Sequence, residues 1–447
     1  MIELYKHQSD VLNATIENKK VGYFLDMGLG KTFVGSEKMR ELDSRINLVI
    51  CQKSKVNDWI EHFEKYYGTH ALPKVVVYDL SDKRSLSMFI NYASGIDEFI
   101  QMVGVINYEL AFRRSELRKL KGFTLMLDES SMIQNETAKR SKFISELNFE
   151  NLILLSGTPT GGKYEKLYSQ LNMLGYNISR KAFYNMYVDY HYDDNEGFPV
   201  MIIDGYKNVE RLKRKMRQYG CVFMKTEEVF DLPQQNFIDV KVNSSKEYRT
   251  FKKDCIAYVG GHWVEDCKQS FHGIDKYVGG TKIVGDTILN KMLGERQLCG
   301  AYNTDKLGAY TDLLESTNDR LIVFYNFNNE LDALKRITKE YTTHISEVNG
   351  TNRDLTAYEK FTDSVTFIQY QAGAMGLNLQ KANKIVYFTP PLSSELFEQS
   401  KKRIHRIGQA QPCFYYKLIC KNSIEQKIYK TLDMRRDYTD KLFERGE

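Results

Sequence analysis

The chain has 447 residues, of which 42% are hydrophobic and 27% are charged. This length and composition predict a globular protein whose cores are divided over two or three domains. The net charge of +5 permits a polyanionic partner but does not demand one. No apolar run approaches the roughly 20 residues that span a bilayer, and the start MIELYKHQSD does not resemble a signal peptide. We therefore expect a cytoplasmic location.

Short apolar runs rich in β-branched residues alternate with longer amphipathic stretches in the first third of the chain, and again after residue 319. This alternation predicts an α/β fold with parallel sheets covered on both faces, and two such sets predict two lobes. The predicted strands are 21–25, 47–51, 74–78, 102–106, 123–127 and 151–155 in the first set, and 320–324, 365–369, 384–388 and 414–418 in the second.

Residues 160–318 between these sets are aromatic and charged, with helical stretches such as 208–220 and glycine pairs at 260–261 and 279–280. No Pro- or Ser-rich linker separates the halves. We therefore expect a helical accessory region that packs on the lobes.

The seven cysteines are scattered without a CxxC pair, which predicts unpaired thiols in a reducing compartment. One cluster carries metal-ligand residue types, although its spacing is irregular for a zinc site. The cluster either binds a metal ion or has no metal-binding role. Its members are Cys255, His262, Cys267 and His272.

The first predicted strand leads directly into DMGLGKT, residues 26–32. Gly28 and Gly30 allow successive backbone N–H groups to point at phosphate oxygens at the start of a helix. Lys31 would bind the β- and γ-phosphates, and Thr32 would offer its hydroxyl to Mg²⁺. The strict phosphate-loop pattern has a small residue where this chain has Leu25.

A second nucleotide motif is FTLMLDESS, an apolar strand that ends in two carboxylates. Asp128 would hold Mg²⁺ directly or through water, and Glu129 would polarise the water that attacks the γ-phosphate. The alternative is that both residues only cap the helix that follows.

The ordered motifs of the chain resemble those of the SWI/SNF-type branch of the superfamily-two helicases, which are double-stranded DNA translocases built from two RecA-like lobes. That branch favours DEMGLGKT, which accounts for Leu25. The other motifs that carry the resemblance are YKHQ, LVICQKSKVNDWIEHFEKY, VINYE, LSGTPTGGKYEKLYSQLNML, FMKTEEVFDLP, LGERQLCG, FIQYQAGAMGLNLQKANKIVYF and QSKKRIHRIGQ.

The resemblance implies a division of the chain into three parts. RecA-like lobe 1, with the phosphate loop and a helical accessory region at its end, would occupy residues 1–235. A family-specific insertion and linker would occupy 236–310. RecA-like lobe 2, with the arginine fingers, would occupy 311–447.

The resemblance also implies ATP and Mg²⁺ as cofactors and assigns roles to individual residues. Gln8 would read adenine, and His405 is expected to orient or pack. The nucleotide-binding residues would be Gln8, Asp26, Gly28, Gly30, Lys31 and Thr32, with Thr32 and Asp128 on the metal. The catalytic residues would be Lys31, Asp128, Glu129 and the two fingers Arg403 and Arg406. Ser156 and Thr158 would couple the nucleotide to DNA, and the DNA contacts would be Lys53, Ser54, Tyr108, Gln371 and Gly373.

Some residues depart from the family pattern, and for others more than one role is open. Gln371 stands where the family more often has threonine or serine, and residues 371–379 could instead form a plain strand-to-helix turn. The basic stretches 211–217 and 433–443 either add DNA affinity or are solvated helix faces. For Lys401 and Lys402 we expect solvated side chains.

The implied function is a DNA-stimulated ATPase that moves along or remodels double-stranded DNA by closing and opening its lobes. One alternative is a helicase that separates strands or remodels forked or branched DNA. Another is an ATP-gated DNA-binding scaffold that recruits a nuclease or a replication protein. The motifs extend close to both ends of the chain, as in phage and bacterial members. That likeness suggests DNA replication, repair or recombination in a microbial cell or virus-infected host cytosol, with a monomer as the default state.

Overall fold

A computed structural model describes residues 3–68, 74–93, 95, 100–195, 198–266, 274–373 and 376–443. The chain forms two compact units. The first unit contains residues 1–231 and 435–447, and the second contains residues 232–434.

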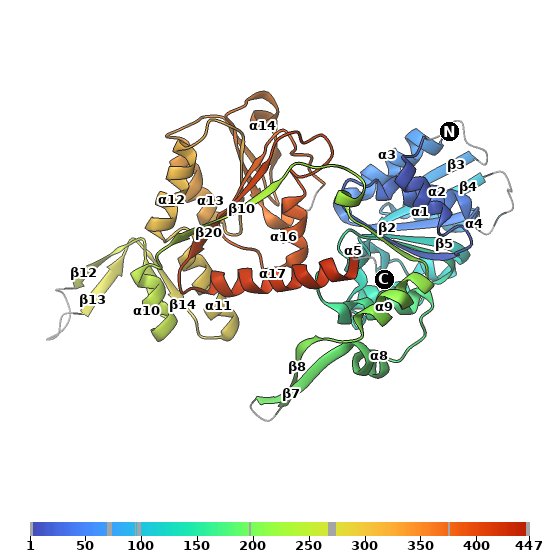
Figure 1. The fold of residues 1–447 in the computed structure, drawn as a ribbon, viewed down its shortest axis with the longest axis horizontal. Helices are drawn as coiled ribbons and strands as arrows, with labels where there is room; N and C mark the ends of the chain where they lie inside the picture. Colours follow the sequence, from blue (N-terminus) through green and yellow to red (C-terminus); the bar gives the residue numbers. More distant parts are fainter. Residues whose placement is uncertain are drawn as a thin grey trace. The chain divides into compact units, whose positions relative to one another are not determined.

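The first unit is built on a parallel sheet of seven strands in the order β3-β4-β2-β5-β6-β1-β9 (Figure 1). Parallel strands place all their carboxyl ends at one edge of the sheet, so the loops that follow β1, β5 and β6 are neighbours. The strands are β1 (Lys20–Leu25), β2 (Ile46–Cys51), β3 (Lys74–Asp79), β4 (Ile100–Asn107), β5 (Lys121–Asp128), β6 (Asn148–Leu155) and β9 (Cys221–Met224).

Alternate residues of each strand enter two different cores. On β6, Leu152 and Leu154 belong to one core, while Ile153 and Leu155 belong to the other. This alternation arises because successive side chains point to opposite faces of a sheet, and both faces are covered as expected for a parallel sheet. Helices α1 (Lys6–Asn13), α2 (Lys31–Glu41) and α3 (Val56–Tyr67) cover one face; α4 (Lys83–Ala93), α6 (Lys139–Ser145), α7 (Leu167–Leu174), α8 (Arg180–Tyr187) and α9 (Val209–Gln218) cover the other.

The second unit is built on a seven-stranded sheet in the order β10-β20-β19-β15-β18-β16-β17, in which the β16–β17 pair alone is antiparallel. Its strands are β10 (Gln235–Val242), β15 (Leu321–Tyr325), β16 (Ile345–Val348), β17 (Arg353–Asp354), β18 (Val365–Gln369), β19 (Lys384–Tyr387) and β20 (Cys413–Cys420). Helices α12 (Thr304–Glu315) and α13 (Asn328–Thr338) cover one face; α14 (Thr356–Lys360), α16 (Ser394–Lys401) and the start of α17 (Ile424–Phe443) cover the other. The predicted fold class, two parallel-sheet lobes flanked by helices, is confirmed.

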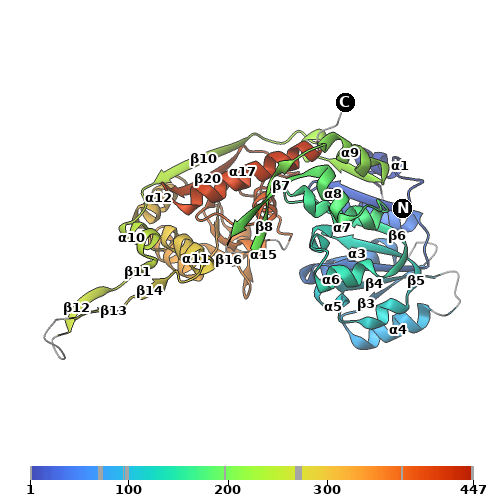
Figure 2. The same cartoon turned by 90° about the horizontal axis from the view of Figure 1, so that it is seen from below.

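The accessory parts contain antiparallel ribbons as well as the predicted helices. In the first unit, β7 (Val188–Asn195) pairs with β8 (Phe198–Tyr206). In the second, α10 (Lys246–Asp254) and α11 (Ile288–Cys299) pack against β11 (Ile256–Val259) and β14 (Thr281–Val284). The ribbon continues as β12 (His262–Asp266) and β13 (Ile274–Val278), which extend away from α10 and α11 (Figures 1 and 2). The predicted glycine pairs lie where β11 passes into β12 and β13 into β14.

The units and the predicted segments divide the chain differently in two places. Strand β10, which we expected in a linker, pairs along its whole length with β20 and is therefore an edge strand of the second sheet. The chain from Arg435 onward, which we expected in the second lobe, groups with the first unit. There the Tyr164 hydroxyl donates a hydrogen bond of 2.5 Å to the Tyr438 carbonyl.

No helix in the described part of the chain combines the length and the apolar character that crossing a membrane requires.

Candidate functional site

The predicted phosphate loop joins β1 to α2. Gly30 caps α2 in the left-handed conformation, with φ of 75°, and Gly28 has φ of 93°. A Cβ atom on Gly30 would lie only 2.1 Å from Gln8 Nε2. The left-handed backbone therefore favours glycine at position 30, and a side chain there would also displace the Gln8 amide. The loop ends at a helix N-terminus, where backbone N–H groups suit an anion.

Lys31 and Asp26 make contacts within this loop. The Lys31 ammonium donates hydrogen bonds to the carbonyls of Leu25 (2.8 Å) and Asp26 (3.1 Å). The buried Asp26 carboxylate accepts a hydrogen bond from the Thr226 backbone N–H at 3.2 Å, and the Thr226 hydroxyl donates to the Met27 carbonyl at 3.2 Å. Asp26 thus ties the loop to Thr226, a residue that our sequence reading did not single out for the site.

Gln8 also packs against the loop. Its Nε2 donates to the Leu29 carbonyl at 3.2 Å, and its Oε1 accepts from the Tyr5 N–H at 3.0 Å. The amide nitrogen therefore holds α1 to the phosphate loop, and the amide oxygen caps the start of α1. The role of Gln8 in reading adenine stays a prediction.

The two predicted catalytic carboxylates lie where β5 ends. The Trp59 indole N–H donates to Asp128 Oδ2 at 2.9 Å. Burial raises the pKa of Asp128, whereas the hydrogen bond from Trp59 and the charge of Lys31 oppose that rise. Glu129 adopts a left-handed conformation with φ of 55°, which is costly for a residue with a side chain. The left-handed conformation of Glu129 turns the chain sharply after β5.

Ser156 links the loop after β6 to Glu129. Its hydroxyl donates to Glu129 Oε2 at 3.2 Å and accepts from the Thr158 N–H at 3.1 Å. Ser156 is buried, and Thr158 is half-buried. The structure thus brings Lys31, Asp128, Glu129 and Ser156 to neighbouring loops at one edge of the sheet.

Tyr108 requires a correction. We expected it to contact DNA, but its side chain is 0% exposed, and its hydroxyl donates to the Asp128 carbonyl at 2.9 Å. Its hydroxyl therefore holds the backbone at the end of β5. Sequence reasoning also missed the role of Trp59, whose only signal was its presence in a family motif 69 positions before Asp128.

Three of the other predicted DNA contacts are exposed. Lys53 and Ser54 are exposed in a short 3₁₀ helix after β2, and Gln371 is exposed in α15 (Tyr370–Gly373). Gly373 ends that helix, and the next two residues lie outside the described part of the chain. These DNA contacts stay predictions.

The two predicted fingers differ in burial. Arg403 is 1% exposed, and its Nη1 donates to the Leu377 carbonyl at 3.5 Å. This burial inside the second unit does not support a finger role and indicates that Arg403 positions residues 377–379. His405, expected to orient or pack, contacts the Pro233 carbonyl through Nε2 at 2.9 Å.

Arg406 has the character that a finger requires. It is half-buried, and its guanidinium donates to Asn378 Oδ1. Among the described residues no carboxylate lies within ion-pair distance of it. Burial lowers the pKa of Arg406 without an opposing carboxylate, so its charge is available for a phosphate.

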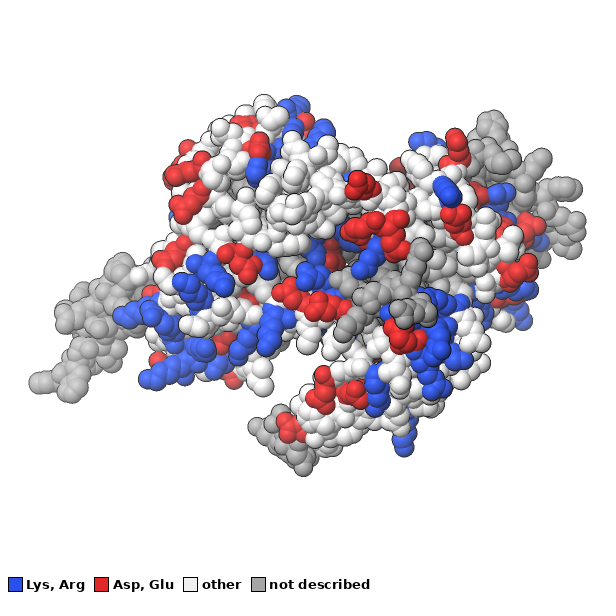
Figure 3. Space-filling model, in the orientation of Figure 1, with Lys and Arg blue, Asp and Glu red and all other residues white. Residues whose placement is uncertain are grey.

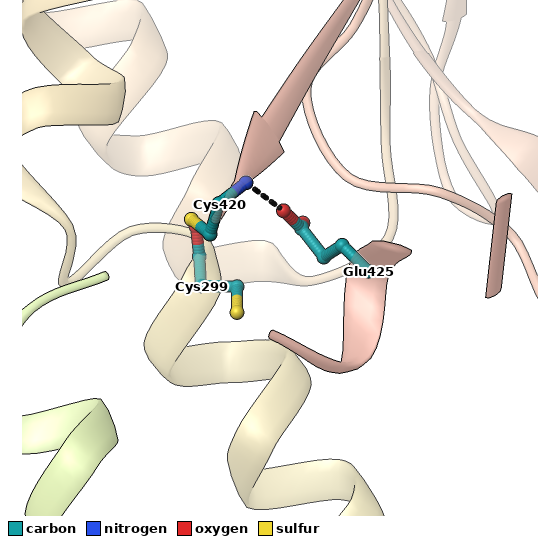
Figure 4. Close-up of side chains that lie close together, drawn as sticks. All are labelled: Cys299, Cys420 and Glu425. Atoms are coloured by element: carbon teal, nitrogen blue, oxygen red, sulfur yellow. Dashed lines mark hydrogen bonds between the residues drawn. The ribbon is translucent and has the colours of Figure 1, made fainter. Parts of the chain in front are cut away.

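The described residues contain one cluster of possible metal ligands, and it is not the predicted one. Cys299, Cys420 and Glu425 in the second unit are buried, with their ligand atoms within 4.8 Å of one another (Figure 4). Glu425, however, pairs with the fully buried Lys306 at 2.5 Å and accepts from the Cys420 N–H at 2.9 Å. Burial raises the pKa of Cys299, which keeps it a thiol. The cluster is therefore a buried ion pair lined by thiols.

The predicted metal cluster falls largely outside the described residues. Cys255 ends α10 in a left-handed conformation with φ of 57°. Cys267 and His272 are not among the described residues, nor is the side chain of His262.

Replacing Lys306 with methionine is expected to lower the free energy of unfolding by about 3–5 kcal/mol, because it leaves the Glu425 carboxylate buried without its partner. Combining Lys306→Met with Glu425→Gln removes that orphan charge and should recover much of the loss. Urea unfolding of both variants measures the difference. Equal destabilisation by the single and double variants would show that packing, rather than charge, holds this core.

The family model described as an SNF2-related domain matches residues 7–304, and the model described as a helicase conserved C-terminal domain matches residues 305–408. Together they cover nearly all of both units.

Individual relatives are distant. The chain is 24% identical over 461 residues to SWI/SNF-related matrix-associated actin-dependent regulator of chromatin subfamily A member 1 of Homo sapiens, which covers 94% of this chain and 41% of that protein. It is 22% identical over 470 residues to DNA repair and recombination protein RAD54-like of Gallus gallus, covering 91% and 61%. The chain thus spans less than two thirds of either relative.

Among solved structures, the chain is similar to the Sulfolobus solfataricus SWI2/SNF2 ATPase core in complex with dsDNA. The identity is 19%, the match covers 98% of this chain and 92% of that one, and the TM-score is 0.43.

Proposed function

The chain belongs to the SNF2-related family and is an ATP-hydrolysing enzyme, and from this premise we propose that it is a translocase on double-stranded DNA. In this proposal ATP hydrolysis drives the two units through closing and opening, and the motion moves the protein along DNA or remodels it. DNA repair or recombination, named for the relative from Gallus gallus, and DNA replication are the proposed settings.

The observation that carries the proposal is the arrangement of loops after β1, β5 and β6. Lys31 begins the helix behind the phosphate loop, and Glu129 is turned by its left-handed backbone and held by Ser156. In the proposed reaction Lys31 binds the β- and γ-phosphates. Glu129 orients the attacking water and accepts its proton.

The donor set fits Mg²⁺. Thr32 is the second residue of α2, directly after Lys31, and Asp128 ends β5 with one carboxylate oxygen held by Trp59. A hydroxyl and a carboxylate are the hard oxygen ligands that Mg²⁺ uses. When bound, the ion neutralises charge on the β- and γ-phosphates. Thr32 and Asp128 are therefore the proposed metal-holding residues, and Trp59 is proposed to position Asp128.

Trp59→Phe is expected to raise the Mg²⁺ concentration for half-maximal ATPase activity about tenfold or more, because loss of such a supporting hydrogen bond typically costs 10–100-fold in metal affinity or activity. Phenylalanine keeps the packing against Phe63, whose ring centroid is 5.7 Å away. Titration of ATPase activity with Mg²⁺ checks this, and Trp263→Phe is the matched control. An unchanged Mg²⁺ requirement in Trp59→Phe would contradict the positioning role.

The proposed transition-state partner from the second unit is Arg406, since its guanidinium lacks a carboxylate partner among the described residues. The proposed DNA contacts are the exposed Lys53 and Ser54 in the first unit, and Gln371 with Gly373 in the second. Such residues would hold phosphates without reading sequence.

The proposal is tested by measuring ATP hydrolysis alone and with duplex DNA, single-stranded DNA, forked DNA and RNA. We expect duplex DNA to stimulate turnover most, and blunt duplex to support ATP-dependent displacement of a third strand. Unwinding of forked DNA with little triplex displacement would indicate a strand-separating helicase instead. Tight ATP-dependent DNA binding without stimulation of turnover would indicate a scaffold.

A further inference from the structure

Helix α9 in the first unit separates its basic side chains into two groups. Lys213 is buried and pairs with Glu210 at 2.8 Å. Arg211 and Arg214 are exposed, and Lys215 is half-buried. One lysine therefore serves the structure of the helix, whereas Arg211, Arg214 and Lys215, like the exposed Arg217, reach the surface.

Three of these four surface cations form one face. Arg211, Arg214, Lys215 and Gln218 stand at positions i, i+3, i+4 and i+7, so they share one side of the helix. They line a surface hollow of about 410 Å³. Figure 3 shows basic side chains gathered over the place that α9 occupies in Figure 1. We call these four residues the α9 face.

The described residues offer little to neutralise the charge of this face. Among the described residues no carboxylate lies within ion-pair distance of Arg211 or Arg214. The Lys215 ammonium donates to Gln218 Oε1 at 2.9 Å and lies 5.8 Å from the ring centroid of Tyr176. Like charges three and four residues apart destabilise a helix, so the cluster has a cost that an anionic ligand would offset.

We propose that the α9 face binds the phosphate backbone of double-stranded DNA, as a contact additional to Lys53, Ser54, Gln371 and Gly373. The inference rests on the proposed function. Two of the three cations of the α9 face are arginines, whose planar guanidinium matches phosphate oxygens. Neighbouring residues on one helix face are about 5–6 Å apart at Cβ, so the cations can engage the backbone together. The contact strengthens binding to any sequence.

The test uses the full chain with Arg211→Gln, Arg214→Gln and Lys215→Gln combined. Its affinity for duplex DNA is measured by fluorescence anisotropy over a series of KCl concentrations, with two unrelated DNA sequences. Each lost phosphate contact reduces the slope of log affinity against log salt by about 0.9. We expect the slope to fall by about 2–3 and affinity at low salt to fall about tenfold or more, equally for both sequences.

A matched control removes the same charge elsewhere. Lys246→Gln, Arg249→Gln and Lys253→Gln combined delete three exposed cations on α10. An equal fall in slope in this control would show a general effect of net charge and overturn the proposal. An unchanged slope in the α9 variant, with normal binding by the wild type, would also overturn it. Competition by polyglutamate as effective as duplex DNA would assign the face to an acidic protein.

Folding of the α9 variant is checked by circular dichroism and thermal unfolding. Removal of like-charge repulsion should leave the unfolding midpoint unchanged or higher, so weaker DNA binding with an unchanged midpoint supports the proposal. If the wild-type chain itself fails to bind duplex DNA, the proposed function fails and this inference falls with it. The salt slope of the variant thus separates failure of the inference alone from failure of the proposed function.

Discussion

Replacing Glu129 with glutamine is expected to lower the kcat of ATP hydrolysis about 10²–10⁴-fold while ATP binding is retained. Glutamine has the same shape and can still accept the hydrogen bond that Ser156 donates to Glu129 Oε2. It cannot accept the proton of the attacking water. Single-turnover hydrolysis measures the loss, and titration with a fluorescent ATP analogue measures binding.

Ser156→Ala provides the control for this prediction. It keeps the Glu129 carboxylate but removes the hydroxyl 3.2 Å from it, so we expect a smaller fall in kcat than in Glu129→Gln. Turnover close to wild type in Glu129→Gln would remove Glu129 from the water-orienting role. Loss of ATP binding in that variant would indicate that the carboxylate holds the loop rather than the water.

The central strands of both sheets were predictable because a strand buried on both faces is a continuous run of apolar residues in the sequence. All ten predicted strands are strands in the structure. The strands missed were edge or short ones. Strand β10 has mostly exposed and half-buried side chains, and β17 has only two residues. An edge strand is set by its pairing partner, here β20 for β10, and that partner is far away in the sequence.

The nucleotide site was partly predictable for the same reason. The phosphate loop is local, since its glycines, lysine and threonine are consecutive or nearly so. The burial of a side chain, in contrast, depends on residues that are distant in the sequence. Lys401, expected to be solvated, is 5% exposed and pairs with Glu398 at 2.5 Å. Tyr108 and Arg403 likewise carry polar groups that sequence alone places at the surface, but the fold buries them against backbone carbonyls.

Arg406→Ala is expected to lower the kcat of ATP hydrolysis about a thousandfold, because a planar, permanently charged group no longer meets the charge that spreads over the transferring phosphoryl oxygens. ATP binding should change little, since the phosphate loop belongs to the other unit. Steady-state hydrolysis with saturating duplex DNA, together with nucleotide titration, separates the two effects.

Arg406→Lys tests whether the fork or the charge matters, because lysine keeps the charge but lacks the planar pair of donors. We expect only a small recovery of kcat over Arg406→Ala. Asn378→Ala removes the partner that accepts a hydrogen bond from Arg406, and a modest loss there would assign Asn378 to positioning. Lys402→Ala removes a positive charge four residues earlier and should leave kcat near wild type. Retained turnover in Arg406→Ala would defeat the finger role, and Arg403, which is only 1% exposed, offers no accessible replacement.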